Sequence, residues 1–400
     1  MCGIALTLAM SVCLVLGLLP IATFASLLPG FTAAWGLSDT EAGWISGVYY
    51  IGYVLAVPFI MSTTDRRDAR PVYLCGAALS AVSTFAFAAL AHGFWSALLW
   101  RAVAGIGLAG TYMPGLKILT DRSRDRVPAR DIGIYTACYS FGTGVSFLLA
   151  GWVGTPYGWR MAFVAAALGP LAAMLATAAL VRPAVPQHRA QRSSIIADFR
   201  RTLANRAVLG YVLAYSTHNF EAWAMRSWVV SLLVFAAARA GGTALSWSPT
   251  EIATVVTLLG VPGTVLGNEL ALRIGRTRAI TMIMLASAAA SAGVGLTAAG
   301  SYDLLVALVM LHGFLIPADA GALVAGTVTV APAEVQGASL AVQASAGFGA
   351  SFIGPLVVGV VLDRTGGASD GAAWRAAFIT IAAFACLGPL ALRLAALRTR

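Results

Sequence analysis

The chain has 400 residues, of which 59% are hydrophobic and 10% are charged, and it contains 42 glycines. This composition excludes a large soluble domain and predicts membrane helices that pack through small residues. The formal net charge of +10 would suggest nucleic acid as the partner of a soluble protein. Here the arginines lie just outside apolar segments, where they orient a membrane chain, so we exclude a nucleic-acid partner.

Apolar segments of the roughly 20 residues that a bilayer crossing needs recur along the whole chain. They begin near residues 5, 40, 71, 94, 131, 158, 207, 249, 278, 302, 337 and 373. The first segment has no basic leader and is longer than the core of a signal peptide, so we expect it to be retained. The sequence therefore predicts an all-α polytopic membrane protein with twelve transmembrane helices.

The cationic residues fall in alternate connections between these segments. Twenty Lys and Arg side chains lie on one side, and only Arg160, Arg239, Arg364 and Arg375 lie on the other. By the positive-inside rule, we expect both termini in the cytoplasm. We expect a multi-pass protein of a cell membrane, and the bias towards Arg over Lys suggests a bacterial inner membrane.

Two halves of the chain resemble each other. The pattern Trp-Arg-x-Ala-Phe begins at Trp159 and again at Trp374, each time at the start of the last segment of a half. Between the halves, residues 182–206 form the longest polar stretch. We expect two six-helix bundles, residues 1–181 and 207–400, joined by a cytoplasmic linker, as in transporters built from repeats.

Two local motifs point to one family. Residues 101–110 read RAVAGIGLAG, and residues 61–70 read MSTTDRRDAR. The first resembles the Arg-x-x-x-Gly-x-Gly-x-Ala motif of the major facilitator superfamily, and the second its Gly-x-x-x-Asp-Arg-x-Gly-Arg-Arg/Lys loop. In the second, Met61, Asp68 and Ala69 depart from the pattern. The resemblance covers the whole length of the chain.

This resemblance implies the major facilitator fold, with two pseudo-symmetric six-helix bundles, and a secondary transporter. It also implies that Arg101 handles protons or substrate, and that a cytoplasmic gate involves Asp65, Arg66, Arg70, Glu269 and Arg276. In the loop after the eighth segment the acid is missing, and Glu269 is the residue that could replace it.

Glycines in the apolar segments have a simpler interpretation. Gly105, Gly107 and Gly110 fit the dinucleotide pattern Gly-x-Gly-x-x-Gly, but they lie inside an apolar span without a preceding strand. We interpret them as helix-packing residues, like the pairs Gly43/Gly47 and Gly263/Gly267. The five cysteines have no paired spacing, so we expect no disulfide framework, metal site or other cofactor.

Ionisable residues inside the spans are the candidates for function, because charges in the bilayer are costly. The seventh span holds His218, Glu221 and Arg226, and the tenth holds His312 and Asp319 around Pro317. A buried carboxylate beside a histidine suits a proton relay. The alternatives are a structural Glu221–Arg226 pair and a His312 bonded to a helix carbonyl.

The partner of Asp319 stays open among Arg101, Arg226 and His312. Tyrosines in the second, fourth and fifth spans are candidates for cavity walls, although packing is the commoner role of tyrosine at helical spacing. They are Tyr49, Tyr53, Tyr112, Tyr135 and Tyr139.

These residues predict a proton-coupled secondary transporter that works by alternating access. Arg101 and Arg226 favour an anionic or zwitterionic organic solute, and we expect import by symport. Export of drugs or metabolites by antiport is the alternative, although the Gly-Pro motif of such exporters does not follow Gly142. The expected partners are a small-molecule substrate, protons and the lipid bilayer, and we expect a functional monomer.

A polytopic enzyme or sensor is the alternative from another class. An enzyme would need a nucleophile or metal cluster near one interface, and the sequence offers neither a His-x-x-x-His nor a Gly-x-Ser-x-Gly motif. We therefore expect a protein that is not an enzyme.

Overall fold

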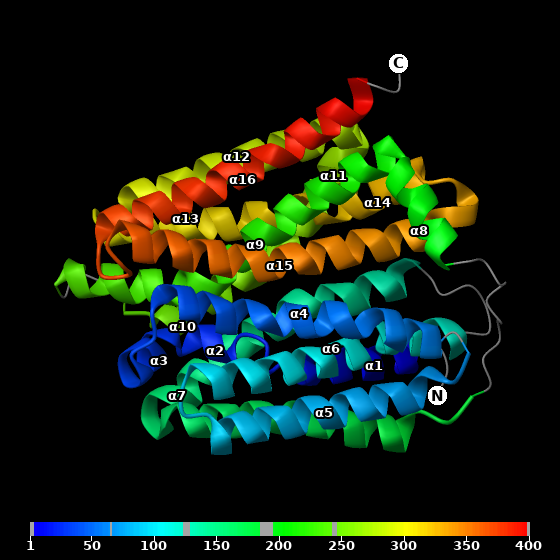
Figure 1. Cartoon of the computed structure of the whole chain (residues 1–400), viewed down its shortest axis with the longest axis horizontal. Helices are drawn as coiled ribbons and strands as arrows, with labels where there is room; N and C mark the ends of the chain where they lie inside the picture. The colour runs from blue at the N-terminus through cyan, green and yellow to red at the C-terminus, as the bar shows by residue number, and fades with distance from the viewer. Residues whose placement is uncertain (1–3, 65, 123–128, 185–194, 242–245, 398–400) are drawn as a thin grey trace. The chain divides into compact units, whose positions relative to one another are not determined.

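The computed structural model describes residues 4–64, 66–122, 129–184, 195–241 and 246–397, and nearly all of them are helical. Two compact units are present. Unit 1 comprises residues 1–37 and 48–191, and unit 2 comprises residues 38–47 and 192–400. Figure 1 labels the helices of both units and colours them along the chain.

Unit 1 is made of long apolar helices in which α5 packs against α6 and α7, and α1 packs against α7. Its helices are α1 (Ile4–Gly17), α2 (Thr23–Ser26), α3 (Leu28–Trp35), α4 (Asp39–Thr64), α5 (Ala69–Leu90), α6 (Phe94–Arg122) and α7 (Ala129–Leu180). The first nine residues of α4 belong to unit 2.

Unit 2 is arranged around α9, which packs against α15 and α16, while α12 packs against α16. Its first helices are α8 (Ile195–Ala204), α9 (Arg206–Ala240), α10 (Pro249–Leu258), α11 (Gly260–Ile274) and α12 (Arg276–Thr297). They are followed by α13 (Tyr302–Leu315), η1 (Ile316–Asp319), α14 (Ala320–Val330), η2 (Ala333–Val335), α15 (Gln336–Thr365) and α16 (Gly371–Leu397). The predicted linker, residues 182–206, therefore contains the short helix α8.

The helices account for the twelve predicted spans. Ten helical segments among the described residues are long and apolar enough to cross a membrane. One of them, within α7, contains two spans, because Gly158 interrupts the helix with a φ of 84°. The first span is divided among α1, α2 and α3, and each alone is short. Most of the predicted segments begin within about two residues of a helix start. Capping residues fix several of these helix starts.

These caps are side chains that accept hydrogen bonds from the unpaired N–H groups of a first helical turn. Asp68 caps α5, Asn205 caps α9 and Ser301 caps α13. At the start of α10, Ser248 and Glu251 form a reciprocal capping box. Polar residues in the loops therefore set where the apolar helices begin.

Glycines let the helices approach at the expected places. A Cβ on Gly263 or Gly267 of α11 would strike the carbonyl oxygen of Phe314 or Ala318. Within unit 2, Gly43 and Gly47 lie in the same way against the backbone of Pro355 and Phe352 in α15. In unit 1, Gly105, Gly107 and Gly110 of α6 face the backbone of α4 and α5. The helix-packing interpretation of these glycines is confirmed.

The first and tenth spans are interrupted within the apolar region at a proline. The first loses its helical pattern at residues 18–22, between α1 and α2. The tenth tightens into the 3₁₀ turn η1 between α13 and α14. Each break contains a proline, Pro20 or Pro317, which removes a backbone donor and disfavours a continuous α-helix.

The close contact of α11 with η1 can be tested with Gly267→Ala. The added methyl group would overlap the Ala318 backbone, so we expect a loss of about 1–3 kcal/mol in the free energy of unfolding, measured by detergent titration. The control is Gly349→Ala on α15, where nothing lies within 4 Å of the added Cβ. Equal stability of the two variants would contradict the close approach.

Candidate functional site

Unit 2 holds four ionisable side chains that meet between α9, α13 and η1. We call His218, Glu221, His312 and Asp319 the histidine–carboxylate cluster. His218 Nδ1 lies 2.7 Å from Asp319 Oδ1, and His312 Nε2 lies 2.8 Å from Glu221 Oε1. Each histidine thus meets a carboxylate from the other span, and the sequence-predicted residues of the seventh and tenth spans come together.

Local structure explains this cross pairing. His218 and Glu221 are three residues apart on α9 and therefore share one face. His312 lies on α13 and Asp319 ends η1, so the break at Pro317 lies between them. The Thr264 hydroxyl of α11 is shared between the Gly260 carbonyl of its own helix at 2.9 Å and the Pro317 carbonyl at the break at 3.1 Å.

The cluster is removed from solvent to different degrees. His312 is 0% exposed, Glu221 and Asp319 are 2% exposed, and His218 is 8% exposed. Burial of unpaired ions is very costly, so the pairing of each carboxylate with a histidine is what permits it. His218 is therefore the most exposed member of the cluster.

A serine that the sequence does not single out completes the cluster. Ser287 of α12 is 1% exposed and donates its hydroxyl to Glu221 Oε1 at 2.7 Å. The same oxygen contacts His312 Nε2. Serine is common in these spans, and nothing in the local sequence distinguishes Ser287 from its neighbour Ser291, so sequence reasoning alone could not find it.

The structure chooses among the alternatives left open by the sequence. Glu221 contacts His312 and Ser287, and His312 uses Nε2 for this carboxylate rather than for a helix carbonyl. The partner of Asp319 is His218, which was not among the three expected partners, so that expectation is wrong. Arg226 lies over the ring of Trp223 at 5.0 Å.

The surroundings of His218 add further polar groups. The ring of Tyr215 stacks on His218 with centroids 5.7 Å apart. Asn219 donates its amide to the Tyr215 carbonyl at 2.9 Å. These contacts fix one side of the His218 ring, and Asp319 occupies its Nδ1 edge.

In unit 1, Arg101 of α6 reaches the break in the first span. Its guanidinium donates to the carbonyls of Pro20 at 3.2 Å and Ile21 at 3.3 Å. Ser146 of α7 donates to the Leu19 carbonyl and accepts from the Ala22 N–H. The backbone groups released by the break are therefore satisfied by α6 and α7, as hydrocarbon surroundings require.

The charge of Arg101 is surrounded by aromatic rings. The guanidinium lies 4.4 Å from the Tyr49 ring centroid and 6.0 Å from that of Phe24. Among the described residues, no carboxylate lies within ion-pair distance of Arg101, which is 4% exposed. Within the same part of the chain, its Nε and the Tyr49 hydroxyl have no hydrogen-bond partner. Unit 1 therefore buries a positive charge that only carbonyls and rings of the described residues stabilise.

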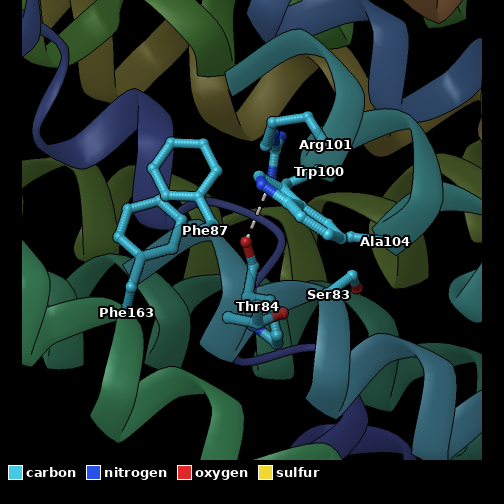
Figure 2. Close-up of a pocket in the computed structure, with 8 residues that line it drawn as sticks. Ser83, Thr84, Phe87, Trp100, Arg101, Ala104 and Phe163 are labelled. Carbon is cyan, nitrogen blue, oxygen red and sulfur yellow. Dashed lines mark hydrogen bonds between the residues drawn. The ribbon is translucent and has the colours of Figure 1, made fainter. Parts of the chain in front are cut away.

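Figure 2 shows a small hollow on one side of Arg101, and the dashed line there is its bond to Pro20. The hydroxyl-bearing side chains of Ser83 and Thr84 face it from α5. The remaining lining residues are Pro20, Phe87, Trp100, Ala104 and Phe163. Both hydroxyls donate to the Ser80 carbonyl, so their oxygens can still accept a hydrogen bond.

The candidate wall tyrosines lie in two groups of unit 1. Tyr49 and Tyr53 are buried on α4. Tyr112 of α6 has its ring 6.2 Å from that of Tyr135 and 5.3 Å from that of Tyr139, both on α7. Tyr135 also donates to the Tyr112 carbonyl at 3.0 Å. Packing explains these contacts, and the role of a cavity wall stays a prediction.

The loop after α4 forms charge contacts around Asp68. Asp65, the expected gate residue, lies outside the described residues, and Arg66 is exposed. Asp68, which departs from the family motif, accepts from Arg122 at 2.7 Å, from the Ala184 N–H at 3.0 Å and from the Arg70 N–H at 3.1 Å.

Two arginines of this group hold the end of α7. Arg70 donates to the Ala178 carbonyl at 2.8 Å, and Arg122 donates to the Arg182 carbonyl at 3.1 Å. Partial burial tends to raise the pKa of Asp68, but the N–H donors of Ala184 and Arg70 and the charged Arg122 outweigh it and hold this pKa below its ordinary value.

The matching loop of unit 2 is built differently. Glu269 contacts Arg273 one turn away at 3.0 Å, and both side chains are at least half exposed. Arg276 donates to Thr329 at 2.7 Å. The gate role of Glu269 and Arg276 stays a prediction. Among the described residues, no group of three or more His, Cys, Asp and Glu side chains is arranged to hold a metal ion.

Comparison with known proteins identifies relatives. Residues 10–250 match the family described as Major Facilitator Superfamily. The probable L-galactonate transporter of Escherichia coli is 27% identical over 216 residues, which are 50% of this chain and 47% of that protein. The niacin transporter NiaP of Acinetobacter baylyi is 26% identical over 130 residues, 32% of this chain and 29% of that protein. The matched region is thus less than half of either relative.

Solved structures share the whole fold. A mutant of the nucleoside transporter NupG superposes with a TM-score of 0.81 at 14% identity, covering 98% of this chain and 99% of that one. A bacterial homologue of the human lysosomal transporter Spinster, in an inward-facing and unoccupied conformation, gives 0.75 at 17% identity and covers 98% and 95%. These identities establish the fold alone.

The Asp68–Arg122 contact can be tested by a double-mutant cycle of Asp68→Asn and Arg122→Gln. Asparagine keeps the helix cap but loses the charge, so we expect a coupling energy of about 1–3 kcal/mol in the free energy of unfolding in detergent. Because the pKa of Asp68 is lowered, the coupling should hold through the neutral range and disappear as the pH falls through the lowered pKa. A coupling of zero at neutral pH would contradict the ion pair.

The role of Arg101 can be tested with Arg101→Met, which keeps an unbranched apolar side chain but leaves two carbonyls without donors. We expect normal membrane insertion and a loss of about 1–3 kcal/mol per orphaned carbonyl in the free energy of unfolding. The control is Arg67→Met at an exposed position. Unchanged stability of Arg101→Met would show that the break does not depend on Arg101.

Proposed function

Because the chain belongs to the major facilitator superfamily, and is thus a multi-pass secondary transporter of small metabolites, we propose that it couples the uptake of an anionic or zwitterionic organic solute to protons. The observation that carries this proposal is the histidine–carboxylate cluster. Ionisable groups are costly inside a span and are retained there for function by default.

The cluster has the chemistry of a proton carrier. Each pair can hold or release one proton, and imidazole changes charge in the physiological pH range. His218 is the most accessible member, so the proton enters there and reaches Asp319 directly. Glu221 lies one turn further along α9 and can share a second proton with His312.

Arg101 supports the solute class. Its buried charge has no carboxylate partner among the described residues, and its Nε and the Tyr49 hydroxyl are unused polar atoms there. An arginine fork presents several donors to a carboxylate. The solutes named for two relatives, L-galactonate and niacin, are organic acids, which agrees with this class. Arg226 adds a second positive charge in unit 2.

The test uses the purified protein in liposomes that contain a pH dye and are challenged with L-galactonate, niacin and other organic acids. Symport acidifies the lumen when solute is added outside, and antiport makes it alkaline. We expect Glu221→Gln to lose proton-driven accumulation by at least tenfold while solute exchange continues.

The matched control for this variant is Glu334→Gln at an exposed carboxylate of unit 2. Concentrative uptake by Glu221→Gln at the rate of the control would remove Glu221 from the proton path. Alkalinisation by the unmodified protein would replace import with export by exchange.

A further inference from the structure

Glu221 has two close polar partners at one oxygen. Its Oε1 accepts a hydrogen bond from the Ser287 hydroxyl at 2.7 Å and contacts His312 Nε2 at 2.8 Å. The three side chains come from α9, α12 and α13, and none is more than 2% exposed. Water therefore does not compete for the carboxylate, and its orientation depends on these two groups.

We propose that Ser287 is a positioning residue that keeps the Glu221 carboxylate directed at His312 and apart from the His218–Asp319 pair. This inference rests on the proposed proton path and adds a residue to it. The two pairs lie within electrostatic range of each other, because the charge of Glu221 acts on both His218 and Asp319. A carboxylate free to turn could join either histidine, since His218 is only one turn away on α9.

The ionisable groups around Glu221 come from few elements. His312 faces it from α13, Asp319 lies in η1, and His218 and Arg226 share α9 with it. From α16, Phe378 places its ring 6.5 Å from that of His312. The carboxylate accepts a hydrogen bond from the Ser287 hydroxyl of α12. This hydroxyl is neutral, so removing it changes no charge.

The chain offers a matched control on the same helix. Ser291 lies one turn further along α12, is 0% exposed, and donates its hydroxyl to the Phe378 carbonyl at 3.0 Å. Ser287→Ala and Ser291→Ala therefore each remove one buried hydroxyl bond from α12. Only the first removes a donor from Glu221, so a merely structural effect would appear in both variants.

The experiment is infrared difference spectroscopy of the purified full chain on pH titration, with Glu221→Gln identifying the carboxylic acid band of Glu221. Loss of a hydrogen bond to the carboxylate favours the protonated acid, so we expect Ser287→Ala to keep this band to a pH about one unit higher. In Ser287→Thr, which keeps the hydroxyl, and in Ser291→Ala, the Glu221 band should disappear at the same pH as in the unmodified protein.

The same variants in liposomes separate this inference from the proposed function. A shifted band in Ser287→Ala, together with a shifted pH profile of acid uptake, supports both. A shifted band without any proton-coupled uptake by the unmodified protein supports the positioning role and overturns the transport proposal. An unshifted band in Ser287→Ala, or an equal shift in Ser291→Ala, overturns the role of Ser287 whatever the transport result.

Discussion

The need to satisfy every backbone polar group in the absence of water governs this structure. A continuous helix meets that need by itself, but the first and tenth spans are interrupted near Pro20 and Pro317. Arg101 and Ser146 bond to backbone groups at the first break, and the Thr264 hydroxyl reaches the Pro317 carbonyl at the second. The side chains that bond to the breaks thus come from neighbouring helices. These three polar residues of the spans lie where a helix is broken.

The histidine–carboxylate cluster lies on both sides of the second break. His312 and Asp319 are seven residues apart, so they lie on one face of the tenth span and meet α9 at two levels. Each histidine receives a carboxylate from the other span. This arrangement pairs both carboxylates of the cluster with histidines, which limits the free-energy cost of burying four ionisable groups.

Much of this architecture is predictable from the sequence because bilayer thickness fixes how long an apolar segment must be. The spans, the glycine contacts and the ionisable residues of the seventh and tenth spans follow from that constraint. Partners do not, because they depend on how helices pack. Asp319 pairs with His218, an option that spacing along the chain did not suggest, and Ser287 looks like any other serine of an apolar run. Asp68 shows the same limit: a departure from a motif forms the best-connected charge contact of its loop.

The two units use their buried polar groups in different ways. In unit 1, Arg101 keeps a positive charge that carbonyls and the Tyr49 ring stabilise without neutralising it. A charge of this kind attracts an anion, and the binding of an anion would lower the electrostatic cost of burying it. In unit 2, each histidine lies against a carboxylate, so one added proton changes the charge of a pair and the electrostatic field that its neighbours experience. A fixed charge suits the binding of an anionic solute, whereas a histidine paired with a carboxylate suits a transferable proton. This physical difference is our reason for proposing different roles for the two groups of side chains.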